Sequence, residues 1–102
     1  MTKVVLTSFA KKSQAIAFAK KLIAEHLAAC AMTLPGATSV YRWKGKAQTA
    51  TEALLLIKTT HERLGALEKF FKLHHPYELP QYLVLSAIAS KKFGAWVEKE
   101  VR

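Results

Sequence analysis

Residues 39–60 read SVYRWKGKAQTATEALLLIKTT, two β-rich runs joined by a short polar turn at Lys44, Gly45 and Lys46. Strand-forming residues on both sides of a glycine-containing turn are typical of a β-hairpin. In the second arm, residues 53–57 are apolar at every position. Such a strand needs cover on both of its faces, unlike a strand in a sheet that shows one side to water. We therefore expect a hairpin whose second strand lies inside the fold.

The length of 102 residues, 51% of them apolar, predicts a single domain over residues 1–102 with one modest core. No apolar run is long enough to span a bilayer. Lys11 and Lys12 interrupt the first apolar stretch before it reaches the length of a secretory signal. The single cysteine, Cys30, fits a reducing compartment. We therefore expect a cytoplasmic protein without membrane attachment.

The net charge of +9 permits binding to polyanions or acidic membranes, or simply favours solubility. The basic residues occur as scattered pairs, such as Lys20 with Lys21 and Lys91 with Lys92, and not as one run. This distribution favours a solvated surface over a nucleic-acid interface.

The chain contains no aspartate and no asparagine, which excludes a Ser-His-Asp triad and an EF-hand loop. Its four glycines lie far apart in the sequence, so the chain contains neither a P-loop nor the glycine-rich motif of dinucleotide-binding proteins. The sequence contains no recognisable pair of catalytic carboxylates, no nucleophile–base pair and no oxyanion motif. We expect a protein that is not an enzyme.

The order of elements is β-α-β-β-α-β followed by a short terminal helix, which predicts an α+β, ferredoxin-like fold of four antiparallel strands with two helices on one face. Strands are expected at residues 3–9, at 29–34, in the second hairpin arm to about residue 59, and at 82–88. Pro35-Gly36 is expected to break or bend the strand at 29–34 before the chain resumes extended at 39–43. Helices are expected from Ser13 to about residue 27, from Thr60 to the residues before Pro76, and from Ser90 onward, with those three polar residues as N-caps.

Helical spacing predicts which side chains face the core. In the first helix the expected stripe is Ile16, Ala19, Ile23 and Leu27, widened by Ala15 and Leu22; in the second it is Leu64, Leu67 and Phe71; in the last it is Phe93, Trp96, Val97 and Val101. Two helices can cover only one face of the sheet, yet three strands are apolar on both sides. The second face is expected to drive self-association, most simply into a closed ring.

Four stretches resemble the CutA family of small trimeric proteins linked to divalent-cation tolerance. They are LAAC (residues 27–30), LPGATSVYRWKGK (34–46), Glu52 followed by LLLIKT (54–59), and HHPYELP (74–80). Together they span most of the chain, and their order and spacing are more specific than any single motif. The resemblance implies a tight homotrimer with the sheets facing inward and the hairpin reaching a neighbour. It also implies a role in divalent-cation tolerance through metal binding, with copper foremost.

The resemblance further implies a cleft between subunits near Trp43, Glu52, Lys58, His75 and Tyr77 that would take a small ligand or ion. Glu52 and Lys58 are an even number of residues apart and leave the same face of the strand, so they predict either an ion pair at a subunit junction or an anion site beside Tyr77. Trp43 and its neighbour Tyr41 are expected to be interface aromatics and, as the alternative, stacking platforms.

Cys30, His74 and His75 are the candidate metal ligands, because thiolate and imidazole suit copper or zinc. The alternative is that Cys30 is a small buried apolar residue and that the adjacent histidines point in different directions.

Three positions depart from the family pattern. Some members have a cysteine, taken as a copper ligand, where this chain has Thr7; the usual glutamate is Gln81 here, and the usual proline is Ser86. These departures remove one ligand and one negative charge from the implied cleft.

Two alternatives to metal binding follow from the residues. One is a PII-like sensor that binds a small anion or nucleotide in the cleft. The other is a nucleic-acid-binding module, which is disfavoured because residues 53–58 lack the aromatic signature of RNA-recognition sheets.

Overall fold

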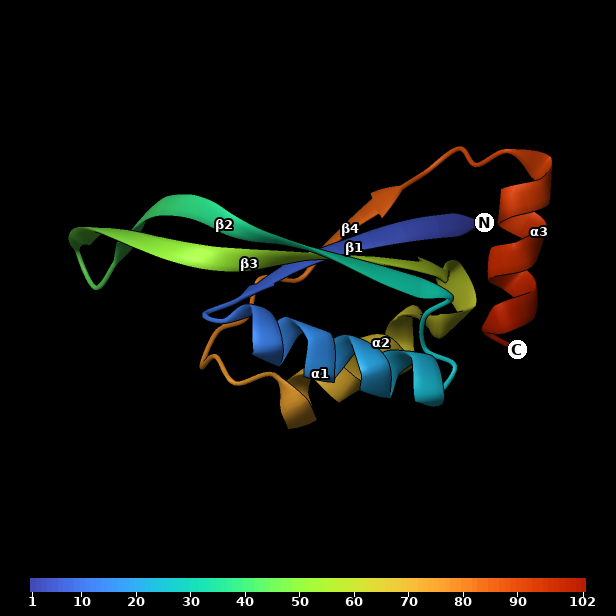
Figure 1. The fold of residues 1–102 in the computed structure, drawn as a ribbon, viewed down its shortest axis with the longest axis horizontal. Coiled ribbons are helices and arrows are strands. Elements are labelled where there is room, and N and C mark those ends of the chain that lie inside the picture. Colours follow the sequence, from blue (N-terminus) through green and yellow to red (C-terminus); the bar gives the residue numbers. More distant parts are fainter.

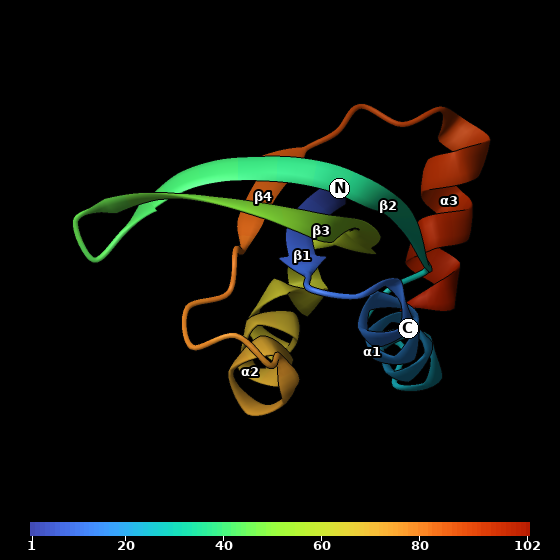
Figure 2. The same cartoon turned by 60° about the vertical axis from the view of Figure 1, so that its left-hand side comes forward.

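The computed structural model describes all 102 residues (Figure 1). The chain forms β1 (Thr2–Phe9), α1 (Lys12–Ala24), β2 (Cys30–Trp43), β3 (Lys46–Thr60), a 3-10 turn (His61–Arg63), α2 (Leu64–His74), β4 (Leu83–Ser86) and α3 (Lys91–Glu100). The strands make one antiparallel sheet in the order β2-β3-β1-β4. Both α1 and α2 lie on the same side of this sheet, and α3 stands at one end of it (Figure 2). The predicted α+β, ferredoxin-like arrangement is confirmed.

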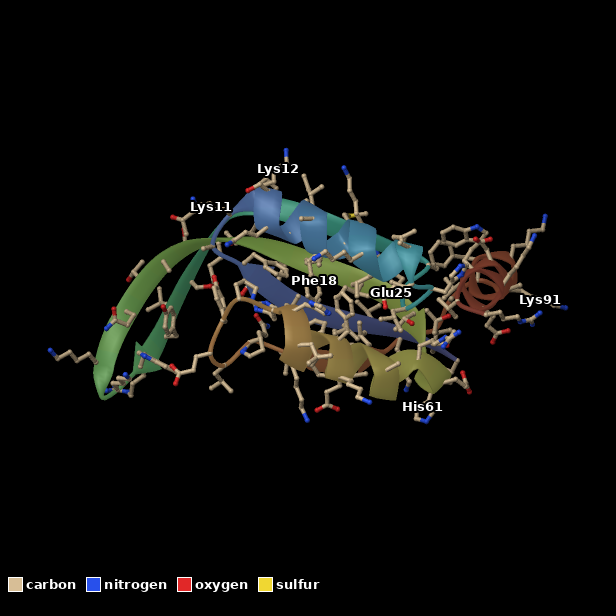
Figure 3. All side chains as sticks on the ribbon, turned by 90° about the horizontal axis from the view of Figure 1, so that it is seen from below. Lys11, Lys12, Phe18, Glu25, His61 and Lys91 are labelled. Carbon is tan, nitrogen blue, oxygen red and sulfur yellow. The ribbon has the colours of Figure 1, made fainter.

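The core lies between the sheet and the helices α1 and α2. Phe18 of α1 is its centre: the ring lies 5.1 Å from Phe9, 5.2 Å from Phe70 and 5.1 Å from Phe71, measured between centroids. Figure 3 shows this side chain between the two helices, whereas the labelled Lys11, Lys12 and Lys91 point outward. The other buried members are Val5, Ala15, Leu22, Leu27, Ala28, Ala53, Leu55, Ile57 and Leu67.

Helix α1 differs from the expectation at its start. It begins at Lys12, so Ser13 lies inside the helix and the N-cap is Lys11. The cap bond runs from the backbone N–H of Lys11 to Oε1 of Gln14 at 3.2 Å. The prediction that Ser13 caps the helix is wrong, because helical geometry already begins one residue before it, at Lys12, and the Gln14 side chain bonds back to the N-cap residue.

The buried stripe of α1 also differs from the prediction. It consists of Ala15, Phe18 and Leu22, whereas Ile16 and Ile23 are exposed. The helix is rotated so that its largest ring enters the core, because Phe18 buries more apolar area than either isoleucine. The two isoleucines lie on the flank of α1 that faces β2.

The hairpin is confirmed, and its first arm is one continuous strand. The turn has Lys44 at φ 49° and Gly45 at φ 79°, the pair of positive values of a tight hairpin turn. The register of β2 against β3 shifts between Leu34 and Ala37, with Gly36 at φ 81°. Pro35-Gly36 therefore bends the strand through a bulge and does not break it.

The remaining element ends follow the sequence in part. Thr60 makes no side-chain cap bond and is followed by the 3-10 turn, so its predicted role as the cap of α2 is wrong. Helix α2 ends at His74, as expected from Pro76 two residues on. Ser90 caps α3 as predicted, with Oγ accepting a 3.3 Å bond from the N–H of Phe93. Strand β4 covers only four of the seven residues expected to form it.

The sheet face opposite α1 and α2 is apolar and uncovered. We call it the open face; cross-strand pairing assigns to it Val4, Leu6, Met32, Leu34, Leu54, Leu56, Leu83 and Leu85. Met32 is 54% exposed and Leu83 is 52% exposed. Single exposed apolar residues are ordinary, but a contiguous set of this size marks an interaction surface.

Helix α3 packs less deeply than expected. Val97 and Val101 are buried with Ala29, whereas the rings of Phe93 and Trp96 contact each other and remain exposed. None of the three helices has the length and apolar character needed to cross a membrane.

Candidate functional site

A pocket of about 860 Å³ lies where the hairpin meets the segment that follows α2. One wall is formed by β2 and β3 and includes Ser39, Tyr41, Trp43 and Glu52. The other wall is formed by residues 76–81. Elements distant in sequence thus place an acidic group and several aromatic rings around one hollow.

Glu52 is held by three hydroxyl groups at the base of this pocket. Its Oε2 accepts hydrogen bonds from Ser8 Oγ at 3.0 Å and from the hydroxyl of Tyr77 at 2.8 Å, and its Oε1 accepts one from Ser39 Oγ at 2.6 Å. Partial burial raises the pKa of Glu52, but the bonds from Ser39, Tyr77 and Ser8 together bring it below its ordinary value. Glu52 is therefore a fixed carboxylate and not a carboxylic acid.

The same contact acts in the opposite direction on the phenol. Burial and the hydrogen bond to Glu52 raise the pKa of Tyr77 well above its usual range. Tyr77 therefore remains a hydrogen-bond donor at any physiological pH.

His75 is buried beneath the pocket, stacked on Phe9 at a centroid distance of 4.4 Å. Its Nε2 lies 3.0 Å from the carbonyl oxygen of Ser8, and its Nδ1 accepts the backbone N–H of Tyr77 at 3.1 Å. A carbonyl can only accept and an amide N–H can only donate, so Nε2 carries the proton and Nδ1 presents its lone pair. Burial lowers the pKa of His75, which keeps this neutral form.

These hydrogen bonds form a closed cycle, which we call the polar ring. Its members are Glu52, Ser8, His75 and Tyr77. Ser8 bonds Glu52 through its hydroxyl and His75 through its carbonyl; Tyr77 bonds Glu52 through its phenol and His75 through its N–H. Each member restrains two others, so the ring ties β1, β3 and the segment after α2 together.

Of the residues predicted for the cleft, Trp43, Glu52 and Tyr77 line the pocket and His75 supports it. Lys58 does not. It lies six residues from Glu52 along β3, a separation of roughly 20 Å. On the open face it is opposite Val4 and Cys30, so within one chain no ion pair joins it to Glu52.

The three predicted metal ligands are not brought together within the chain. Cys30 is paired across from Lys58 on the open face, and His75 is buried on the helix-covered side. His74 is exposed and packs on Phe70 at a centroid distance of 4.3 Å. No group of three or more histidine, cysteine or acidic side chains converges anywhere in the chain.

Thr7 lies next to His75, with Oγ1 at 3.2 Å from Nε2. The residue that replaces the family's cysteine is therefore adjacent to one of the predicted ligands, but it presents a hydroxyl where a thiol would be. Both ring nitrogens of His75 already have partners in the chain, so a metal could bind there only after one of these bonds opened.

Sequence reasoning did not identify Ser8 and Ser39 as part of the site. Both are small polar residues inside strands whose neighbours are largely apolar or β-branched. That contrast was the available signal, because a buried hydroxyl in a strand needs a partner.

This fold and site define a class of small α+β proteins in which a ferredoxin-like sheet carries an extended hairpin and a polar site at the base of that hairpin. Within this class, the chain belongs to the CutA1 divalent ion tolerance protein family, whose sequence pattern matches residues 3–100.

Curated relatives and solved structures agree with this assignment. The divalent-cation tolerance protein CutA of Citrobacter koseri is 40% identical over 100 residues, covering 97% of this chain and 87% of the relative. The structure of the divalent cation tolerance protein Cut A1 from Thermus thermophilus superposes with a TM-score of 0.93 at 37% identity, covering 98% of both chains. The protein described as the periplasmic divalent cation tolerance protein CutA from Archaeoglobus fulgidus gives a TM-score of 0.95 at 27% identity, covering 100% of both.

Proposed function

We propose that this chain serves divalent-cation tolerance by binding a cation in the pocket at the base of the hairpin, as a cytoplasmic homotrimer. One observation carries the proposal. Among the fifteen residues that line the pocket, the only charged ones are Glu52 and Glu78, although the whole chain has a net charge of +9. A pocket that excludes lysine, arginine and histidine from so basic a chain favours cations over anions.

The donors around the pocket are mainly oxygen atoms. Besides the two carboxylates they include the amide of Gln81 and the hydroxyl of Thr51. Among divalent first-row metals, affinity for a given site generally rises to a maximum at copper(II), so copper remains the first ion to test. A copper site built from Cys30, His74 and His75 would require ligands from a second copy of the chain.

The open face supports self-association, because its apolar side chains would otherwise remain in water. The number of copies, three, comes from the family resemblance. The molecule is 44 Å long, and the distal hairpin accounts for much of this extension (Figure 1), so it can reach a neighbouring subunit.

The two alternatives are less well supported. An anion in the pocket would meet two carboxylates and no basic side chain, since Lys58 lies elsewhere. Base stacking on the open face would need aromatic rings, and the residues assigned to it are valine, leucine and methionine together with Cys30 and Lys58.

Copper(II) titration of the purified chain by calorimetry tests the proposal. We expect binding that weakens at least about tenfold in Glu52→Gln, because that change removes a charged ligand worth on the order of 1.4 kcal/mol or more. Glu25→Gln, at the exposed end of α1, is the matched control and should bind as the unmodified chain does. Absence of heat with copper, zinc and manganese would reject metal-ion binding at this pocket.

A further inference from the structure

The pocket is much larger than a metal ion requires. Its volume of about 860 Å³ lies within the range of roughly 300–1,000 Å³ typical of sites for organic molecules. A single metal ion with its bound waters would fill only a small part of it. The remaining space calls for a ligand with a carbon skeleton.

The wall formed by β2 is aromatic. Tyr41 and Trp43 alternate with Ser39 along the strand, so all three point to the side on which Glu52 lies. The rings are only partly covered, with Tyr41 45% and Trp43 38% exposed. The faces of such rings attract organic cations, and tryptophan attracts them most strongly.

The other wall supplies a second negative charge and is stiff. Glu78 lies between Pro76 and Pro80, whose fixed φ angles restrict the backbone of this segment. Glu52 is immobilised by its three hydroxyl donors. Aromatic rings, two carboxylates and no basic side chain together provide the chemistry that recognises an alkylammonium group.

We propose that this pocket binds an organic ammonium ion, with its charged nitrogen beside Glu52 and its carbon chain against Trp43 and Tyr41. The inference uses the pocket of the proposed function and adds a ligand class to it. The nitrogen replaces some of its hydration shell with carboxylate oxygens, and its methylene groups leave water against the rings.

The test is calorimetric titration with 1,4-diaminobutane in phosphate buffer, since common amine buffers would compete. The neutral 1,4-butanediol and the dianion glutarate are probes of similar length. We expect heat from the diamine and none from the diol or the dianion. Equal affinity for diamine and diol, or no heat from the diamine, would overturn the inference.

Two variants separate the contribution of the aromatic face of Trp43 from that of the size of its side chain. Trp43→Leu keeps an apolar side chain but removes the aromatic face, and we expect about tenfold weaker diamine binding, near the upper range of a cation–π contact. Trp43→Phe should recover part of this loss. Unchanged affinity in Trp43→Leu would contradict the assigned position of the ligand. Circular dichroism and light scattering on each variant establish that fold and assembly are retained; if Trp43→Leu fails this check, Glu78→Gln, at an exposed loop position, decides in its place by the same loss of diamine binding.

The outcomes for this inference and for the proposed function differ. Copper binding that is unaffected by Trp43→Leu, without any diamine binding, would reject the ammonium site and leave the metal proposal standing. Diamine binding without copper binding would reject the metal proposal and leave the ammonium site standing.

Discussion

The hydroxyl of Tyr77 donates a 2.8 Å hydrogen bond to Oε2 of Glu52, joining two residues 25 positions apart in the chain. The phenol comes from the segment after α2 and the carboxylate from β3. This bond therefore closes the pocket wall of residues 76–81 onto the sheet. Because both partners also belong to the polar ring, its removal should affect the local fold as well as the pocket.

Tyr77→Phe should lower the free energy of unfolding by about 1.5–3 kcal/mol, the usual contribution of a hydrogen bond to a charged group. It removes one of the three donors to Glu52, so the pKa of this carboxyl should also rise toward its ordinary value. Urea denaturation measures the first effect, and NMR titration of the glutamate carboxyl measures the second. Tyr41→Phe is the control, since the Tyr41 hydroxyl does not bond Glu52; equal losses in the two variants would contradict the role assigned to the bond.

Acid should destabilise the folded chain through His75. Folding lowers the pKa of His75, so the unfolded chain binds more protons as the pH falls below about 6.5, its ordinary value. Stability should therefore be full above that pH and decline below it, with a second decline below 4.5 as Glu52 protonates. Melting temperatures between pH 8 and 4, at one protein concentration, measure this.

His75→Gln should flatten the first of these declines, whatever its effect on stability at neutral pH. His74→Gln is the matched control, because His74 is the exposed neighbour on the same turn and should leave the decline in place. A decline that persists unchanged in His75→Gln would exclude His75 as its source.

Phe18→Ala should cost about 3–5 kcal/mol, the usual range for deleting a buried aromatic ring, because Phe18 contacts three other phenylalanines. Ile23→Ala on the same helix should cost less than half as much, since Ile23 is 43% exposed. Chemical denaturation of both variants checks the rotation of α1. Similar losses would mean that both faces of the helix contribute equally to the core.

Leu6→Glu should disrupt assembly. Leu6 lies in the middle of the open face, paired with Leu56 on one side and Leu83 on the other. Light scattering should give a mass of about 34 kDa, three times 11.4 kDa, for the unmodified chain and a lower mass for the variant. Leu73→Glu, an exposed change on α2, should keep the assembled mass. A folded, unmodified chain of 11.4 kDa at dilute concentration would refute the trimer.

The fold was largely predictable because strong local signals agree with tertiary packing. The turn at Lys44-Gly45, the cap at Ser90 and the stop before Pro76 each have a local cause that the structure retains. The orientation of α1 was not predictable, since Ile16 and Phe18 each fit a helical stripe. Only the packing of Phe18 against Phe9, Phe70 and Phe71 decides between them.

The site was predictable in its principal residues and not in its geometry. Glu52, Tyr77 and Trp43 were identified from the family resemblance, and the structure brings them to one pocket. Lys58 was grouped with them by the same resemblance and by its even spacing from Glu52. Even spacing fixes which face of the strand a side chain leaves, but the six-residue separation along β3 keeps Lys58 away from the pocket. Ser8 belongs to no sequence motif, and its role follows only from the hydrogen bonds that it makes in the polar ring.

The bulge at Pro35-Gly36 determines which side chains the pocket contains. Before it, Leu34 is opposite Leu54; after it, Ala37 is opposite Glu52, so one extra residue has been inserted into β2. The inserted residue reverses which face of the sheet each side chain of residues 37–43 points to. An unbulged strand would turn Val40 and Arg42 toward Glu52 and send Tyr41 and Trp43 to the opposite side. A guanidinium would then enter the pocket, so the absence of basic side chains from its lining depends on a single backbone bulge at Pro35-Gly36 of β2.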